Sequence, residues 1–206
     1  MKYLKNIVLN ITFLLLFIFL TVLVLTKQTL YFDKTISIFV YSLRTPLLTN
    51  VMSAVSNLGD VYAGIVVSLL IILMLIIKEH KKDAVIFSLS TITVGLINYV
   101  LKLVFAIPRP NFSALTTLYD FSYPSGHAMN NTFLYGMIVY YISRYGKNKL
   151  IKLLALAGSI VWITLMGISR IYLGVHYPTD VLAGYFLGLW ALITVTLVSS
   201  KSVKRD

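Results

Sequence analysis

The sequence contains no cysteine, which excludes disulfide bonds and thiolate metal ligands anywhere in its 206 residues. It is also poor in charge, since Asp, Glu, Lys and Arg make up 12% of the chain whereas hydrophobic residues make up 58%. A chain of this size then has too little polar surface to cover a water-soluble globule. The composition therefore predicts a protein that resides in the lipid bilayer.

Acidic residues are especially scarce, with 7 Asp and Glu against 18 Lys and Arg, and the net charge is +11. Such an excess of positive charge can bind nucleic acid, but here the Lys and Arg residues lie in short clusters between apolar runs and form no single basic face. Anionic lipid headgroups are the simpler counterpart. We expect the bilayer, and not nucleic acid, to be the partner, while the sequence carries no signal for the oligomeric state.

Six apolar runs are long enough to form membrane-spanning helices. The first run has the basic start of a signal peptide, but it exceeds the roughly 7 to 15 apolar residues of a signal core and no small-residue cleavage site closes it, so we expect a retained helix. Because no repeat or linker divides the chain, the sequence predicts an all-α fold, a six-helix membrane bundle in one domain over residues 1–206. The predicted spans are 6–26, 59–77, 84–104, 127–143, 150–168 and 179–199.

The connection from Lys27 to Asp60 carries aromatic and aliphatic residues among a few charges. This composition predicts one or two amphipathic helices that lie along the membrane interface. The alternative is a segment that packs between the first two spans.

The basic residues indicate how the bundle is oriented. The chain ends and the short connections 78–83 and 144–149, with Lys152 beside the second, hold 12 of the 18 Lys and Arg residues if they share one side of the membrane. Because cytoplasmic loops are enriched in Lys and Arg, we expect both termini in the cytoplasm. The remaining polar clusters then fall on the extracytoplasmic face.

The first polar cluster runs from Lys102 to Arg109-Pro110 at the outer end of the third predicted span. A lysine there is costly unless it reaches the interface or has a partner. Pro108 and Pro110 end the helix, so Arg109 is expected on the loop above Lys102. Taken alone, the same pair also fits an interfacial anchor and a headgroup contact.

The second cluster, Pro124-Ser125-Gly126-His127, opens the fourth predicted span. Unpaired backbone N–H groups at a helix start favour an anion, Gly126 permits close approach, and Ser125 adds a hydroxyl donor. His127 then stands beside the bound anion, where it can donate a proton. By itself the tetrapeptide also fits an ordinary turn with a helix cap and a structural histidine.

The third cluster places Ser169-Arg170, His176 and Asp180 around the start of the sixth predicted span. Arg170 leaves the fifth span, and Pro178 suits the first position of the next helix. Asp180 follows His176 by four residues, so its carboxylate can accept a hydrogen bond from one ring nitrogen and leave the other as a nucleophile. The alternative is an aspartate that only stabilises the helix start, beside an interfacial histidine. On one face, the three clusters together predict an anion site with proton-transfer and nucleophilic groups.

The three clusters resemble the signature of the type 2 phosphatidic acid phosphatase family, the lipid phosphate phosphatases. The matching residues are Lys102-x6-Arg109-Pro110, Pro124-Ser125-Gly126-His127 and Ser169-Arg170-x5-His176-x3-Asp180. No signature position departs from the pattern, and the resemblance extends from about the first outer connection to the sixth span.

The resemblance implies a phosphatase that hydrolyses a phosphate or diphosphate monoester of a membrane lipid through a phosphohistidine. His176 would attack phosphorus, Asp180 would orient it, and His127 would protonate the leaving oxygen. Neither a metal nor another cofactor is expected. The residues implied to hold the phosphoryl oxygens are Lys102, Arg109, Ser125, Gly126 and Arg170.

Phosphatidylglycerophosphate and undecaprenyl diphosphate are the foremost expected substrates, with phosphatidic acid and diacylglycerol diphosphate as further candidates. The signature contacts only the phosphoryl group, so selectivity must lie elsewhere, in the Lys27 to Asp60 connection or the Asn111 to Tyr123 loop. A lipid phosphotransferase, in which an acceptor other than water takes the phosphoryl group, is the alternative among enzymes. A lipid transporter fits less well, because transporters place ionisable groups near the bilayer midplane and here they lie at the span ends.

Overall fold

The computed structural model describes residues 2–116 and 118–202, and every regular element among them is an α-helix. This confirms the all-α fold class. The helices are α1 (Lys2–Leu25), α2 (Leu30–Ser42), α3 (Pro46–Leu58), α4 (Val61–Ile77), α5 (Lys81–Phe105), α6 (Gly126–Tyr145), α7 (Lys149–Tyr172) and α8 (Pro178–Ser202).

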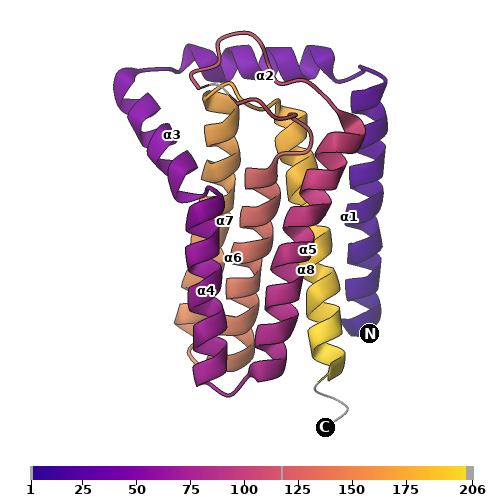
Figure 1. Cartoon of the computed structure of the whole chain (residues 1–206), viewed down its shortest axis with the longest axis vertical. Helices are drawn as coiled ribbons and strands as arrows, with labels where there is room; N and C mark the ends of the chain where they lie inside the picture. Colours follow the sequence, from indigo (N-terminus) through magenta and orange to yellow (C-terminus); the bar gives the residue numbers. More distant parts are fainter. Residues whose placement is uncertain (1, 117, 203–206) are drawn as a thin grey trace.

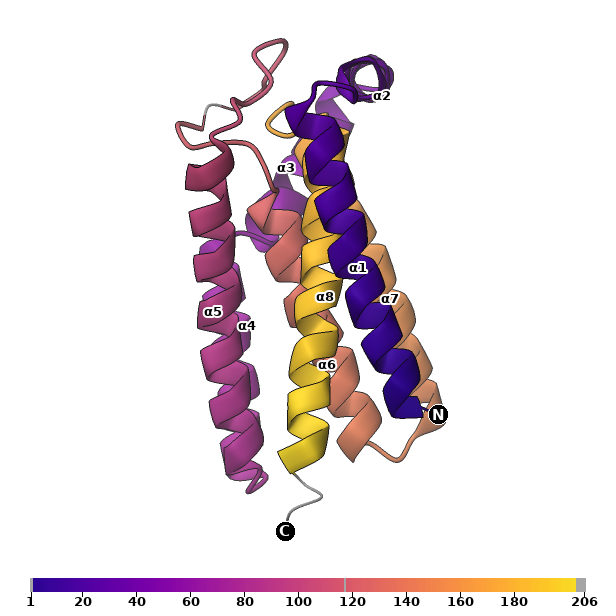
Figure 2. The ribbon, with the colours of Figure 1, turned by 90° about the vertical axis from the view of Figure 1, so that its right-hand side faces the viewer.

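The bundle consists of α1 and α4 to α8, which run side by side along the long axis of the molecule (Figures 1 and 2). α6 packs against both α7 and α8, and α1 packs along α8. α2 crosses one end of the bundle, and α3 slants from there to the start of α4 (Figure 1). Each predicted span coincides with one bundle helix, with boundaries that differ by a few residues.

Among the described residues, four helices, α1, α5, α7 and α8, are long and apolar enough to cross a membrane, and α3 with α4 would make a fifth span bent by 48°. The chain is therefore a multi-pass membrane protein. α6 occupies the place of the fourth predicted span but carries more polar residues. These find partners inside the bundle, where Asn131 donates to the Gly59 carbonyl at 2.9 Å and accepts from the Trp162 indole at 3.0 Å. The count of six spans stays a prediction.

The helices expected in the Lys27 to Asp60 connection are present as α2 and α3. The Thr45 hydroxyl caps α3 by accepting from the Leu48 N–H at 3.2 Å. Asp60 caps α4 by accepting from the Ala63 N–H at 3.0 Å, so a new helix starts at the bend. That α2 and α3 lie at the membrane interface stays a prediction.

Two glycines of α8 bring its backbone against α6. A Cβ atom at Gly184 would lie 2.6 Å from the Ser125 carbonyl oxygen, and one at Gly188 would lie 2.8 Å from that of Met129. Both distances are too short for a carbon atom, so glycine sets the separation of the two helices, as small residues do in membrane helix pairs. This packing fixes the start of α6 against α8.

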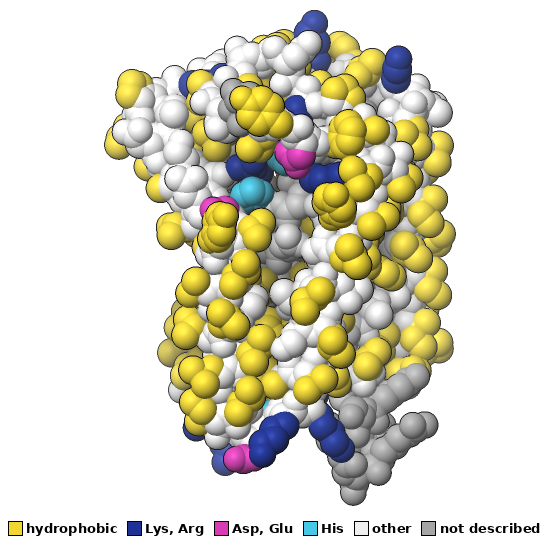
Figure 3. Space-filling model, in the orientation of Figure 1, with side chains coloured by type: hydrophobic (Ala, Val, Ile, Leu, Met, Phe, Trp, Pro, Cys, Tyr) yellow, Lys and Arg dark blue, Asp and Glu magenta, His cyan; other side chains and the backbone are white. Residues whose placement is uncertain are grey.

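The two ends of the bundle differ. The start of α1 and the connections from α4 to α5 and from α6 to α7 lie together at one end, where Lys and Arg side chains are exposed (Figures 1 and 3). There the buried Asp83 accepts hydrogen bonds from Tyr145 and, at 2.7 Å, from Ser199, which joins α5, α6 and α8. Lys204 and Arg205, which enter the cation count, lie outside the described residues.

Candidate active site

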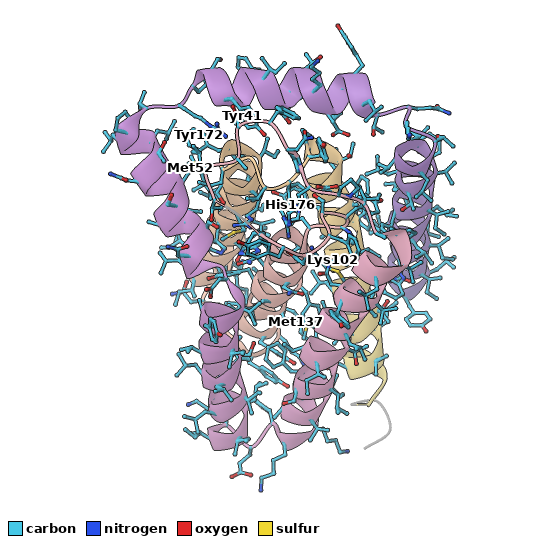
Figure 4. All side chains as sticks on the ribbon, turned by 45° about the horizontal axis from the view of Figure 1, so that its top comes forward. Tyr41, Met52, Lys102, Met137, Tyr172 and His176 are labelled. Atoms are coloured by element: carbon cyan, nitrogen blue, oxygen red, sulfur yellow. The ribbon has the colours of Figure 1, made fainter. Side chains whose placement is uncertain are left out.

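The three polar clusters meet at the other end of the bundle, below α2. Figure 4 labels His176 and Lys102 in the interior of this end. The space-filling view shows a hollow there, around which His, Lys or Arg, and Asp or Glu side chains gather (Figure 3). Residues that are distant in the sequence are thus assembled at one place, as the sequence predicted.

His176 and Asp180 form a buried pair at the start of α8, each 1% exposed. The His176 Nδ1 lies 3.2 Å from the Asp180 Oδ2, which also accepts hydrogen bonds from the Tyr177 N–H at 2.8 Å and from the Ser122 hydroxyl. A carboxylate only accepts, so Nδ1 carries the proton and Nε2 keeps a free electron pair. Asp180 lies in the first turn of α8, which the four-residue spacing anticipated.

The free ring nitrogen of His176 faces Arg109. The Arg109 Nη1 donates to the Val175 carbonyl at 2.6 Å and lies 3.2 Å from the His176 Nε2. Burial holds the pKa of His176 well below its ordinary value, and the charges of Arg109 and Arg170 lower it further. His176 is therefore neutral at neutral pH, which is the state that a nucleophile requires.

Lys102 and Arg109 share one acidic partner, Asp120, on the loop that follows α5. Lys102 lies in the last turn of α5, whose end is closed by the Ala106 N–H bonding to the Lys102 carbonyl at 2.9 Å. Its Nζ donates to the Asp120 Oδ2 at 2.8 Å, and the Arg109 Nη2 donates to the Oδ1 at 2.6 Å. Burial alone would raise the pKa of Asp120, but the hydrogen bonds and charges of the two cations outweigh it and hold that pKa below its ordinary value.

The Ser125 hydroxyl caps α6, accepting from the Ala128 N–H at 3.4 Å, while its own proton remains available to a ligand. That Gly126 helps to hold the anion stays a prediction. A Cβ atom there would lie 2.8 Å from the Asn98 Oδ1 of α5, so this glycine permits two helices to approach. Asn98 also donates to the Pro124 carbonyl at 3.2 Å and so holds the motif against α5.

Arg170 belongs to the last turn of α7, because that helix continues to Tyr172 and does not end before the arginine as the predicted span did. The side chain is buried and its Nη1 donates to the Ser56 hydroxyl of α3. Its Nε has no hydrogen-bond partner within the described part of the chain, so a donor is left for an anion. His127, the second residue of α6, lies within electrostatic range of Arg170 and of His176.

The sequence did not reveal the roles of Asp120 and Ser122. Asp120 is the only acidic residue between Asp83 and Asp180, a signal that could have marked it as a partner for the outer cations. For Ser122 no such signal exists, because a serine four residues before a helix is common. Within residues 2–116 and 118–202, no three His, Asp or Glu side chains are grouped as around a metal ion.

Comparison with known proteins shows the family to which this chain is related. A model of the PAP2 superfamily matches residues 83–204. Phosphatidylglycerophosphatase B of Bacillus subtilis (strain 168) is 33% identical, over 95% of this chain and 96% of its own length. The undecaprenyl-diphosphatase of Sulfolobus acidocaldarius is 32% identical, over 77% of this chain and 74% of its own length.

Solved structures agree with the sequence relatives. The crystal structure of a transmembrane PAP2-type phosphatidylglycerolphosphate phosphatase from Bacillus subtilis matches with a TM-score of 0.87 and 31% identity, over 93% of this chain and 96% of the other. That of Aquifex aeolicus LpxE matches with a TM-score of 0.57 and 26% identity, over 79% and 93%. By its matched segment, its relatives and its fold, this chain belongs to the PAP2 superfamily.

Proposed function

We propose that this membrane protein, a lipid phosphatase by its family and relatives, hydrolyses a phosphate or diphosphate monoester of a lipid through a phosphohistidine. The observation that carries the proposal is the position of His176. Its neutral Nε2 faces a group of cations, and its Nδ1 is held by a buried carboxylate. A nucleophile at the centre of an anion site suits attack on phosphorus.

The first step of the proposed reaction is an in-line displacement. The electron pair of the His176 Nε2 forms a bond to phosphorus, and the bond from phosphorus to the lipid oxygen breaks. The leaving oxygen takes a proton from His127 and departs as a lipid alcohol, or as a lipid phosphate when the substrate is a diphosphate. Asp180 keeps its hydrogen bond to Nδ1 and stabilises the positive charge that develops on the ring.

In the second step, water attacks the phosphohistidine. His127, now neutral, accepts a proton from the water, and the bond from phosphorus to nitrogen breaks to release inorganic phosphate. Lys102, Arg109 and Arg170 stabilise the negative charge on the phosphoryl oxygens in both steps, with Ser125 and the amides at the start of α6 as further donors. These positive charges can take the part that a metal ion plays in other phosphatases.

The relatives supply the substrate classes. Phosphatidylglycerophosphate and undecaprenyl diphosphate follow from the names of two of them. A hydrophobic tail would remain among the helices while the phosphate reaches the cations at the bundle end. By the cation count, that end faces the extracytoplasmic side and both termini face the cytoplasm. We assign these steps to one domain that covers residues 1–206.

The test uses the purified full-length protein with four substrates: phosphatidylglycerophosphate, undecaprenyl diphosphate, phosphatidic acid and diacylglycerol diphosphate. We expect phosphate release from at least one, undiminished by excess EDTA and competitively inhibited by vanadate. Substrate labelled in its terminal phosphate should label wild-type protein in a rapid alkaline quench, which preserves a phosphohistidine, and leave His176→Ala unlabelled. No release from any of the four, a divalent-ion requirement, or equal labelling of the variant would each contradict the proposal.

A further inference from the structure

Asp120 pairs with two of the three cations that the proposed phosphoryl group needs, Lys102 and Arg109. Its Oδ2 accepts from the Lys102 Nζ at 2.8 Å, and its Oδ1 accepts from the Arg109 Nη2 at 2.6 Å and from the Nε at 3.2 Å. A carboxylate presents two oxygens to a guanidinium in the same fork that a phosphoryl group presents. Asp120 thus makes, within the chain, the contacts that a phosphate ester would make.

The carboxylate and a phosphoryl group compete for these donors. The side chains of Lys102 and Arg109 are each 11% exposed, and further hydrogen bonds hold both, to the carbonyls of Phe121 and Val175. The side chain of Asp120 is 57% exposed and lies on a loop. The cations are therefore fixed and the carboxylate is the partner that can turn away into water.

We propose that Asp120 is an internal anion that occupies Lys102 and Arg109 in the empty site and that the substrate phosphoryl group must displace. This inference rests on the proposed function, which places the phosphoryl group at Lys102 and Arg109. A phosphodiester carries one negative charge, the same as the carboxylate it would replace, so the exchange brings no net charge to the cations. A phosphate monoester carries about 1.5 to 2 negative charges at pH 7 and gains from the exchange.

Competition for these cations matters in a bilayer. Phosphodiester lipids surround the enzyme at high local concentration, and an open pair of cations would bind their headgroups. Asp120 blocks that binding. In the empty site it also offsets the repulsion between Lys102 and Arg109, so removing it leaves two adjacent cations without a local anion.

The experiment compares wild type with Asp120→Asn, which keeps the shape and removes the charge. Asp120→Ala is a second neutral variant, and Asp120→Glu restores the charge. Glu79→Gln is the matched control, because it removes the same charge at the opposite, exposed end of the bundle. Each full-length variant is purified in detergent, and thermal unfolding confirms that it is folded.

Two quantities are measured. Calorimetry gives the affinity for inorganic phosphate, and a short-chain phosphatidylglycerol, which is a phosphodiester, is tested as a competitive inhibitor of phosphatidic acid hydrolysis. In Asp120→Asn and Asp120→Ala we expect phosphate to bind about tenfold more tightly, since a charge-assisted competitor is lost. Inhibition by the phosphodiester should strengthen by a similar factor, because one internal competitor weakens equally the binding of every anion that displaces it. Asp120→Glu and Glu79→Gln should stay close to wild type.

Unchanged or weaker phosphate binding in both neutral variants would overturn the inference, because Asp120 would then only hold the cations in place. Tighter phosphate binding with unchanged phosphodiester inhibition would equally overturn it, since the carboxylate would then not compete with a lipid headgroup for the same cations. Failure of the proposed function looks different. Wild-type protein would then release no phosphate from any lipid, whereas calorimetry would still report whether Asp120 competes with an anion.

Discussion

A single oxygen atom organises the proposed nucleophile. The Asp180 Oδ2 receives hydrogen bonds from the His176 Nδ1, the Tyr177 N–H and the Ser122 hydroxyl. The last two donors hold the carboxylate whether or not the histidine changes its charge. The imidazole is therefore held by a fixed acceptor, and Nε2 stays directed at Arg109.

The two histidines are predicted to differ in their response to the leaving group. His176→Ala removes the attacking atom, so activity should be lost on every substrate. His127→Ala removes only the proton donor, which typically contributes about 10² to 10⁴-fold, and the loss should shrink when the leaving oxygen is a weak base. The measurement is the rate of each variant, relative to wild type, on a lipid phosphate and on p-nitrophenyl phosphate.

Asp180→Asn belongs in the same experiment as the intermediate case, since it leaves His176 in place with a poorer acceptor. Its rate should fall between those of the two alanine variants on the lipid substrate. Recovery of His176→Ala on p-nitrophenyl phosphate without recovery of His127→Ala would reverse the assigned roles.

Buried His176 also predicts how stability depends on pH. The pKa of His176 is held by burial, and by Arg109 and Arg170, well below the value of about 6.5 that it has in an unfolded chain. Below pH 6.5 the unfolded chain binds a proton that the folded chain excludes. The free energy of unfolding therefore decreases as the pH is lowered, by at most about 1.4 kcal/mol per pH unit from this group. The melting temperature of wild type should decrease more steeply from pH 6.5 to 5 than that of His176→Gln. Parallel curves would show that His176 takes up no proton on unfolding.

Among the elements, α8 positions the proposed nucleophile, because His176 lies in the turn before it, Asp180 lies in its first turn and its glycines contact α6. It is also tied to α2. The Asp33 carboxylate accepts from the Thr179 N–H at 3.0 Å and from its hydroxyl at 2.8 Å. The helix that crosses the bundle end therefore fixes the turn on which His176 lies.

The packing of α8 on α6 gives a prediction with an internal control. Gly184→Ala would push a methyl group into the Ser125 carbonyl and separate the two motifs, so we expect a loss of about 1 to 3 kcal/mol in stability and a lower kcat. Gly158→Ala makes the same change in α7, where a Cβ atom meets nothing within 4 Å. The melting temperature and phosphate release of both variants should be compared, and equal effects would show that helix separation does not control the site.

The sequence predicted the bundle helices because apolar runs of span length are local signals. It also predicted that the clusters meet, because Arg109-Pro110 follows the third predicted span and Pro124 precedes the fourth. Both therefore lie at the same end of the bundle. It could not predict the bond between Asp33 and Thr179, which lie 146 positions apart. Hydropathy predicted α6 but not the partners of its polar residue Asn131, which are Trp162 of α7 and the Gly59 carbonyl between α3 and α4.

At the scale of the molecule, the fold separates two chemically different ends. One end holds the fixed cations, the buried acid and the proposed nucleophile. The other holds the short basic connections and the network around Asp83. At the first end Lys102 and Arg109 pair with Asp120, whereas the second end carries the Lys and Arg residues of the short connections. The positive-inside rule orients a bundle by such a difference in exposed positive charge between its two ends.

Orientation is therefore open to a direct test with reporter fusions. Alkaline phosphatase, active only outside the cytoplasm, and a fluorescent protein that matures in the cytoplasm would each be fused after Lys82, after Lys149 and between Asn111 and Tyr119. Because the chain ends and these two basic connections, with Lys152 beside the second, together hold 12 of the 18 Lys and Arg residues, we expect fluorescence at the first two positions and alkaline phosphatase activity at the third. The reporters control each other, since a misfolded fusion gives neither signal. Alkaline phosphatase activity at both basic connections would place the site on the cytoplasmic face instead.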